Sequence, residues 1–88
     1  MVSKKVKIVN PTGLHLRPAG VLCETAMKYS SKITFATDNH YEANAKSVLS
    51  VLGACVKSGE EIEFTCDGVD ENEALADIVS AVENGLGE

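Results

Sequence analysis

His15 and Arg17 lie two residues apart in the stretch NPTGLHLRPAG, residues 10–20, directly before an apolar run. A histidine titrates near neutral pH, so its imidazole can serve as an uncharged nucleophile in the cell. The guanidinium of an arginine presents a planar fork of donors that fits phosphate oxygens. Gly13 permits a tight turn at this point, and the Thr12 hydroxyl can donate to the same site. These residue types predict a histidine that can be phosphorylated and a phosphoryl group that its neighbours hold.

A helix is predicted directly after this turn, with Pro18 as its first residue. Apolar residues recur at the spacing of one helical face, namely Ala19, Leu22, Cys23 and Ala26. The N-terminal end of a helix carries unpaired backbone amides and a partial positive charge, which together bind anions. The pattern therefore favours a phosphate site at the start of the helix. A surface histidine that merely follows a turn explains the same residues, and the residues alone leave both interpretations open.

Other kinds of chemistry find little support in the sequence. No second histidine or cysteine is placed to complete a metal site, because His40 falls in a predicted hairpin turn and the three cysteines lack metal-ligand spacing. Neither a Walker-type glycine loop nor a GxGxxG motif is present, so nucleotide binding has no support. A Ser-His-Asp hydrolase needs a pocket for which a fold of this size has little room. The sequence therefore predicts no metal and no cofactor.

The length of 88 residues predicts a single domain over residues 1–88, and 44 % hydrophobic residues with 24 % charged residues is typical of a globular chain. The longest uncharged apolar run, Val48 to Val56, is too short to cross a bilayer, and the N-terminus lacks the apolar segment of a signal peptide. The cysteines form an odd set, Cys23, Cys55 and Cys66, which favours core side chains in a reducing compartment over a disulfide scaffold. We therefore expect a cytoplasmic protein without membrane insertion.

Charge is divided unevenly along the chain. Residues 1–57 hold all eight lysines and arginines and three acids, a net charge of +5, whereas residues 58–88 hold the other ten acids and no base. The chain as a whole carries a net charge of −5, which argues against binding to nucleic acid. The basic part is the part that contains the histidine turn.

Alternation of apolar and polar residues predicts four strands. The alternating stretches are residues 5–8, 33–37, 41–43 and 61–66, and Asp38–Asn39 offers the turn of a hairpin between the second and the third. Strands buried on both faces would show continuous apolar runs, so this alternation favours an antiparallel sheet with one exposed face.

Two further helices are predicted from their ends. Ser47 is placed to cap the first of them, which stops at Ser58–Gly59. Its apolar stripe consists of Val48, Val51, Leu52 and Cys55. Asp70 and Glu73 form a capping-box-like start for the second, which ends at Asn84–Gly85. The element order β-α-β-β-α-β-α predicts an α+β fold, a two-layer open-faced sandwich in which three helices cover one face of a four-stranded antiparallel sheet.

Two stretches of the sequence resemble the signatures of one family. NPTGLHLRPA, residues 10–19, is similar to the phosphorylation-site motif of the HPr family, the histidine-containing phosphocarriers of the phosphoenolpyruvate-dependent sugar phosphotransferase system. KSVLSVLGACVKSGEEIEF, residues 46–64, resembles the second signature of that family, the regulatory-serine helix and the strand after it. The order of the elements matches as well, so the resemblance covers essentially the whole chain.

The resemblance implies a carrier protein rather than an enzyme. In the family pattern, His15 accepts a phosphoryl group at Nδ1 from phosphorylated enzyme I and passes it to a IIA protein or domain, while Arg17 steadies the charge. The implied phosphate cradle consists of Thr12, Leu16, Pro18 and Ala19. Catalysis is then mostly positioning and charge stabilisation, with the partner supplying the other reacting histidine. Many family members carry Ala or Thr at the position of Leu16, so this residue can alter partner contacts.

Ser47 matches the serine that the ATP-dependent HPr kinase/phosphorylase modifies in low-GC Gram-positive bacteria, and a catabolite-control regulator is a further implied partner. Capping of a helix alone also explains a serine at this position. The resemblance implies a docking patch of Leu16, Val48, Leu49 and Leu52 beside His15. The basic part of the chain would surround this patch and steer it toward acidic partner surfaces.

Other functions stay open beside that of a monomeric sugar-branch carrier. The chain can be a mainly regulatory HPr-like protein that binds partners according to the state of Ser47, although such a protein would not need His15. It can also be the carrier of a nitrogen-related phosphotransferase branch.

Overall fold

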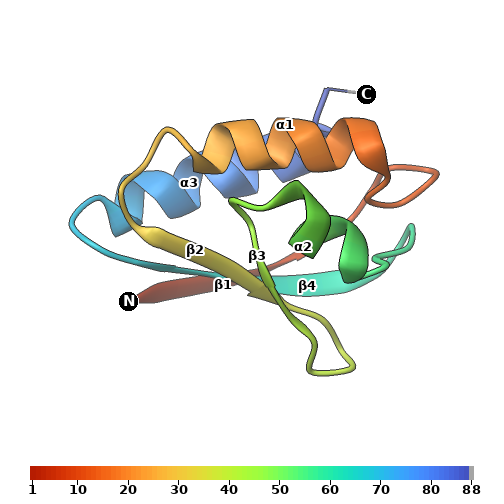
Figure 1. The fold of residues 1–88 in the computed structure, drawn as a ribbon, viewed down its shortest axis with the longest axis horizontal. Coiled ribbons are helices and arrows are strands. Elements are labelled where there is room, and N and C mark those ends of the chain that lie inside the picture. Colours follow the sequence, from red (N-terminus) through yellow and green to blue (C-terminus); the bar gives the residue numbers. More distant parts are fainter. Residues whose placement is uncertain (88) are drawn as a thin grey trace.

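The computed structural model describes residues 1–87 and confirms the predicted order of strands and helices (Figure 1). The elements are β1 (Val2–Lys7), α1 (Leu16–Ala26), β2 (Lys32–Ala36), β3 (Glu42–Asn44), α2 (Val48–Gly53), β4 (Glu61–Asp67) and α3 (Glu71–Glu83).

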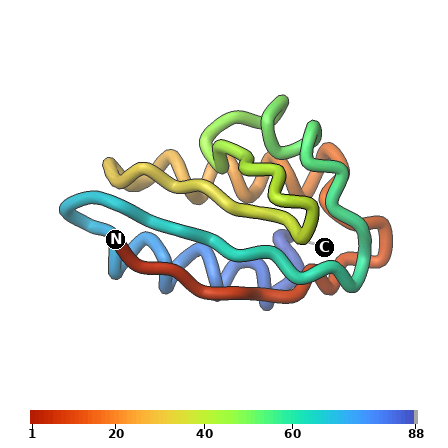
Figure 2. Tube along the Cα trace, turned by 90° about the horizontal axis from the view of Figure 1, so that it is seen from below, coloured from red at the N-terminus to blue at the C-terminus, as the bar shows by residue number. Residues whose placement is uncertain are grey.

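The four strands form one antiparallel sheet in the order β1-β4-β2-β3, so the predicted sheet is confirmed. β4 lies between β1 and β2, with Ile62 opposite Val6 and Phe64 opposite Phe35. The helices lie on one side of the sheet (Figure 1), and Figure 2 shows β1, β4 and β2 side by side when the molecule is seen from below. The fold is therefore the open-faced sandwich expected from the alternating pattern.

The core lies between the sheet and the helices. The rings of Phe35 and Phe64 pack against each other there, with centroids 5.3 Å apart and planes tilted by 59°. Around them, β2 and β4 bury every second side chain, and the helices bury Leu22, Ile78 and Val82. The apolar residues that alternate in the strands and those that recur at helical spacing in α1 and α3 thus pack together in one buried layer.

Helix α1 begins two residues earlier than Pro18, so the prediction that Pro18 opens the helix is wrong. His15 is the N-cap, and Leu16 is the first helical residue. A proline is tolerated at the third helical position because amides of the first turn have no acceptor within the helix. The helix therefore starts directly at the histidine.

Helix α2 ends at Gly53, short of the predicted stop at Ser58–Gly59. Cys55 lies outside the helix with a left-handed backbone (φ +52°) and is exposed, so the prediction that all three cysteines are core side chains is wrong for this one. Cys66 is buried, and Cys23 is half-buried. The left-handed Cys55 turns the chain out of the helical path, and the Val56 carbonyl then accepts a hydrogen bond from the Leu14 amide at 3.0 Å.

The predicted capping box at the start of α3 does not form. Asp70 is the N-cap, but its carboxylate caps no amide of α3. It accepts instead from the backbone amides of Ser30 and Ser31, both at 3.0 Å, and from both serine hydroxyls. Asp70 therefore ties the start of α3 to the loop between α1 and β2, a contact that local sequence spacing does not show.

We expect the fold to lose stability as the pH falls from about 4 to about 2. The hydrogen bonds from Ser31 and Ser30 lower the pKa of Asp70 from 3.8 to about 2. A carboxyl group with a lowered pKa stabilises the folded state at higher pH, and this stabilisation disappears as the group takes up its proton. Thermal melts across this range should show a smaller loss for Asp70→Asn than for the wild type. Equal losses in the two proteins would contradict the assignment.

Helix α3 ends as predicted at Asn84–Gly85. The Leu86 amide donates to the Ala81 carbonyl at 2.9 Å, and the Gly85 amide donates to the Val82 carbonyl at 3.1 Å. Gly85 supplies the left-handed backbone (φ +85°) that this pair of hydrogen bonds requires. This end of the helix is therefore a defined turn.

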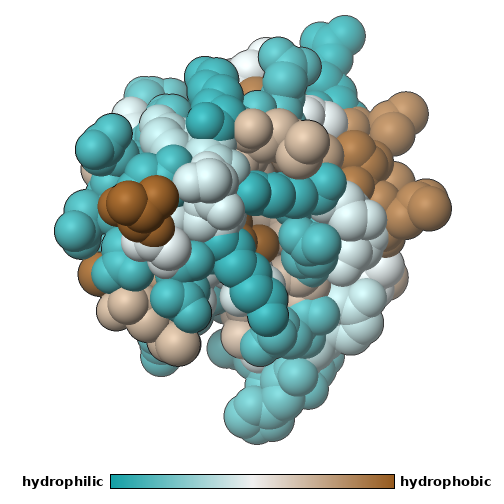
Figure 3. Space-filling model, turned by 60° about the vertical axis from the view of Figure 1, so that its left-hand side comes forward, coloured by the Kyte–Doolittle hydropathy of each residue, from teal (hydrophilic) through white to brown (hydrophobic). Residues whose placement is uncertain are grey.

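Most of the visible surface in Figure 3 is hydrophilic, with hydrophobic side chains projecting mainly at one edge of that face. The large apolar side chains that are exposed include Leu16, Met27, Leu49 and Val69. Within residues 1–87, no helix is both long enough and apolar enough to cross a membrane.

Candidate functional site

His15 stands at the junction between a turn and α1. Its backbone is extended (φ −88°, ψ −168°), and its carbonyl accepts the first helical hydrogen bond from Ala19 at 2.9 Å. The side chain is half-buried and does not cap the helix. The imidazole therefore lies next to the positive end of the α1 dipole, where negative charge is stabilised.

The amides available to an anion at this helix end are those of Leu16 and Arg17. No hydrogen bond among residues 1–87 uses either of them, since the first bond of the helix is made by Ala19. Pro18 has no amide hydrogen. Within the predicted cradle, Leu16 can thus donate from its backbone, whereas Pro18 and Ala19 contribute only by shaping the first turn.

Gly13 holds the turn before His15 against the segment that follows α2. Its backbone is left-handed (φ +71°), and its amide donates to the Asn10 carbonyl at 3.0 Å. A Cβ at this position would lie 2.3 Å from the Val56 carbonyl oxygen and 2.9 Å from the Lys57 Cα. Both the conformation and the close approach therefore require glycine. The adjoining hydrogen bond from Leu14 to Val56 fixes the chain immediately before the histidine.

The side chains around His15 that were predicted to contact phosphate or partners are accessible. Arg17, Thr12 and Leu16 are exposed, and the relative exposure of Leu16 is 68 %. Arg17 is the second residue of α1, so both its backbone amide and its side chain belong to the positively charged N-terminal end of the helix. An exposed apolar side chain and an exposed charged side chain thus occupy the first two positions of the helix.

Ser47 caps α2 as predicted. Its hydroxyl accepts from the Ser50 amide at 3.2 Å, and its carbonyl accepts from the Val51 amide at 3.0 Å. α2 packs against α1, and the Cys23 thiol donates to the Lys46 carbonyl at 3.1 Å, next to the cap. The serine is half-buried at the start of a helix whose position is fixed relative to α1.

Three residues of α2 form the remaining part of the predicted docking patch. Leu49 is 83 % exposed, while Val48 and Leu52 are partly buried against the core. Val51 is fully buried and holds the helix in place. The structure therefore places Leu49 on the surface, off the buried stripe, as the sequence predicts.

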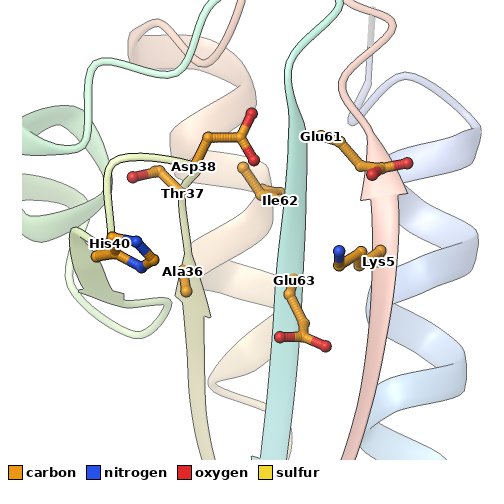
Figure 4. A pocket seen from close by; sticks show the side chains of 8 residues that line it. All are labelled: Lys5, Ala36, Thr37, Asp38, His40, Glu61, Ile62 and Glu63. Atoms are coloured by element: carbon orange, nitrogen blue, oxygen red, sulfur yellow. The ribbon is translucent and has the colours of Figure 1, made fainter.

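The residues that could hold a metal do not gather at one point. Among residues 1–87, no group of three or more His, Cys, Asp or Glu side chains is arranged to bind a metal ion. A hollow of about 210 Å³ lies at the exposed sheet face next to the β2–β3 turn, away from His15. Figure 4 shows that its carboxylates, on Asp38, Glu61 and Glu63, point in different directions.

Asn10 and Val56 belong to the site although sequence reasoning missed them. Asn10 closes the turn before His15, and Val56 binds Leu14 through its backbone carbonyl. Main-chain contacts between distant segments leave no side-chain signature, so only the glycine at position 13 could have pointed to them.

Comparisons with known proteins agree with this geometry. The family model described as "PTS HPr component phosphorylation site" matches residues 2–84. Phosphocarrier protein HPr of Treponema pallidum is 36 % identical over 84 residues, which cover 96 % of this chain and 94 % of that protein. Phosphocarrier protein HPr of Mycoplasma capricolum is 41 % identical over 68 residues, covering 77 % and 75 %.

A solved structure shows the same fold. The crystal structure of an HPr from Thermoanaerobacter tengcongensis matches with a TM-score of 0.94 and 38 % identity, over 100 % of this chain and 98 % of that one. The sheet order, the histidine at the start of α1 and these similarities lead to one conclusion. The chain belongs to the HPr family of phosphocarrier proteins of the phosphotransferase system.

Proposed function

We propose that this chain accepts a phosphoryl group on His15 from phosphorylated enzyme I and passes it to IIA proteins for sugar uptake. The observation that carries the proposal is the position of His15 as the N-cap of α1, with the Leu16 and Arg17 amides not engaged by residues 1–87. A protein acting in this way is a carrier, since the phosphoryl group is bound covalently and then leaves unchanged.

The transfer exchanges one phosphorus–nitrogen bond for another. The lone pair of Nδ1 of His15 attacks the phosphorus of the phosphohistidine on enzyme I, and the broken bond leaves its electron pair on the partner's imidazole. The phosphoryl oxygens carry negative charge throughout. The Leu16 and Arg17 amides, which residues 1–87 leave unbonded, and the end of the helix dipole stabilise that charge without having to rearrange, which is how such sites accelerate transfer.

Arg17 and Thr12 support the same step from the side chains. The exposed Arg17 guanidinium can close over the phosphoryl oxygens as a fork, and docking of the partner then excludes water from the contact. Thr12, exposed in the preceding turn, can add a hydroxyl donor.

Partner docking uses the apolar side chains beside His15. Leu16 and Leu49 are the most exposed of the four proposed docking residues, and Val48 and Leu52 form the partly buried base of the patch. A compact apolar patch next to a charged site fits transient partners such as enzyme I and IIA proteins. The chain then acts as a monomer that exposes one surface to successive partners in the cytoplasm.

Ser47 is proposed as a regulatory phosphorylation site. Its hydroxyl lies at the N-terminal end of α2, where a phosphate is compatible with the helix and adds roughly −2 charges next to Leu49. The added charge would hinder docking of enzyme I while leaving His15 itself unchanged.

The carrier function is tested by a complete transfer. The chain is phosphorylated with labelled phosphoenolpyruvate and enzyme I, isolated, and mixed with separate IIA proteins of sugar and nitrogen branches. Label should move to a sugar-branch IIA protein and leave unmodified chain behind. Transfer only to a nitrogen-branch protein would contradict the sugar assignment, and failure to release the label would favour the regulatory alternative.

Ser47→Asp should raise the KM for the chain as substrate of enzyme I about tenfold while keeping the melting temperature close to that of the wild type. Aspartate is a good N-cap, and its charge suits the positive end of α2. The same charge must be desolvated when enzyme I covers Leu49, and this weakens docking.

The matched control for this variant is Ser80→Asp, which adds the same charge on the exposed side of α3. Its KM should equal that of the wild type. An unchanged KM for Ser47→Asp would show that Ser47 lies outside the docking surface, and a large drop in melting temperature would show that aspartate cannot replace the cap.

A further inference from the structure

Asn10 is buried next to the His15 turn and joins that turn to the end of α3. Only 2 % of its surface is exposed. Its backbone carbonyl accepts from the Gly13 amide at 3.0 Å and closes the turn. Its side-chain Nδ2 donates to the Gly85 carbonyl at 2.7 Å, so it connects segments 75 residues apart. One residue thus both shapes the turn and fastens it to a distant part of the fold.

The segment that receives this hydrogen bond is itself held firmly. Gly85 and Leu86 form the turn that ends α3, and the Leu86 side chain is only 1 % exposed. Gly87 lies against α1, since a Cβ at that position would lie 3.3 Å from Val21 Cγ2. Figure 1 shows this blue segment beside α1. The turn at the end of α3 is therefore a fixed support next to the histidine site.

The His15 turn is held on two sides, by backbone contacts on one and by a side-chain hydrogen bond on the other. On the side of α2, the contacts of Gly13 and Leu14 reach the backbone of Val56 and Lys57. On the side of α3, the hydrogen bond depends on the amide side chain of Asn10. A substitution can therefore release the turn from α3 and leave the α2 side intact.

We propose that Asn10 is a positioning residue for phosphoryl transfer at His15, because it locks the turn before the histidine to the end of α3. The inference rests on the proposed carrier function. Transfer between two histidines requires an in-line approach at a fixed distance, and misplacement of a reacting group by about 1 Å costs up to about 100-fold in rate. Asn10 is buried and acts through the turn, so its loss should affect the transfer step and not the docking of the partner.

The test compares steady-state phosphorylation by enzyme I and phosphoenolpyruvate for the wild type, Asn10→Ala and Asn84→Ala. Asn84 is a matched control, an exposed asparagine on the same turn whose side chain, within residues 1–87, bonds locally to the Ser80 hydroxyl at 3.3 Å. For Asn10→Ala, kcat should fall about tenfold with KM within about twofold of the wild type. Both constants should be unchanged for Asn84→Ala.

Several outcomes would overturn the proposal. A wild-type kcat for Asn10→Ala would show that the residue is only structural, even if the melting temperature falls. A higher KM with an unchanged kcat would place the effect in docking. If the alanine variant is not folded at the assay temperature, Asn10→Ser, whose short side chain cannot reach Gly85, decides by the same criteria. Absence of phosphorylation of the wild type would instead refute the proposed function, so the two failures are distinguishable.

Discussion

Replacing Arg17 with alanine should slow phosphoryl transfer from enzyme I to His15 by about 100- to 1,000-fold, the usual effect of removing one preorganised contact to transition-state charge. The guanidinium is exposed at the second position of α1 and lies outside the core, so the variant should melt close to the wild-type temperature. Single-turnover rates with phosphorylated enzyme I measure the transfer step, and circular dichroism measures the fold.

Two control variants distinguish the effect of the paired guanidinium donors from the effect of positive charge. Arg17→Lys keeps the charge but loses the paired donors, so it should recover only part of the rate. Lys28→Ala removes one positive charge just beyond the other end of α1, where it is exposed, and should transfer at the wild-type rate. A rate for Arg17→Ala within a few-fold of the wild type would reject the proposed role.

Gly13→Ala should lower the free energy of unfolding by about 2–5 kcal/mol. This value is the sum of the strain of a left-handed alanine and the cost of a steric clash. The added Cβ would lie 2.3 Å from the Val56 carbonyl oxygen, and backbone on both sides leaves it little room to move. Urea denaturation gives this free energy directly. Since the same turn carries His15, we also expect slower transfer in molecules that remain folded.

Two other glycines provide matched controls for this change. Gly59 has a left-handed backbone (φ +86°) but open space around it, so Gly59→Ala should cost only about 1–2 kcal/mol. Gly20 lies in α1 with nothing within 4 Å of an added Cβ, so Gly20→Ala should stabilise the fold by about 0.5–1 kcal/mol. Equal effects at positions 13 and 59 would show that the close approach to Val56 has no cost.

Much of the architecture could be predicted because it depends on local patterns. Alternation in β2 and β4 describes which side chains face the helices, and it also favours the antiparallel arrangement that the sheet shows. Ser47 and Gly85 mark helix ends correctly because capping involves residues within one turn of each other. The sequence predicts His15 and Arg17 in the turn before the helix, whereas the structure makes His15 the N-cap and Arg17 the second residue of α1.

The features that the sequence could not show depend on contacts between distant segments. Asp70 accepts hydrogen bonds from two amides and two hydroxyls of Ser30 and Ser31 instead of capping α3. After the early end of α2, the Val56 carbonyl pairs with the Leu14 amide. In the sequence, Asn10 is indistinguishable from an ordinary turn residue, because its hydrogen bond to the Gly85 carbonyl is visible only in the folded chain. In each case the partner lies far away in the sequence.

Phosphorylation with phosphoenolpyruvate and enzyme I, followed by intact mass, decides whether His15 is the phosphoryl acceptor. The chain has two histidines, and His40 lies in the exposed β2–β3 turn, so His40→Ala is the matched control for His15→Ala. The wild type and His40→Ala should each gain one phosphoryl group that is lost in acid and stable in base, while a folded His15→Ala variant gains none. A phosphoryl group on His15→Ala, or its loss in His40→Ala, would contradict the assignment of His15.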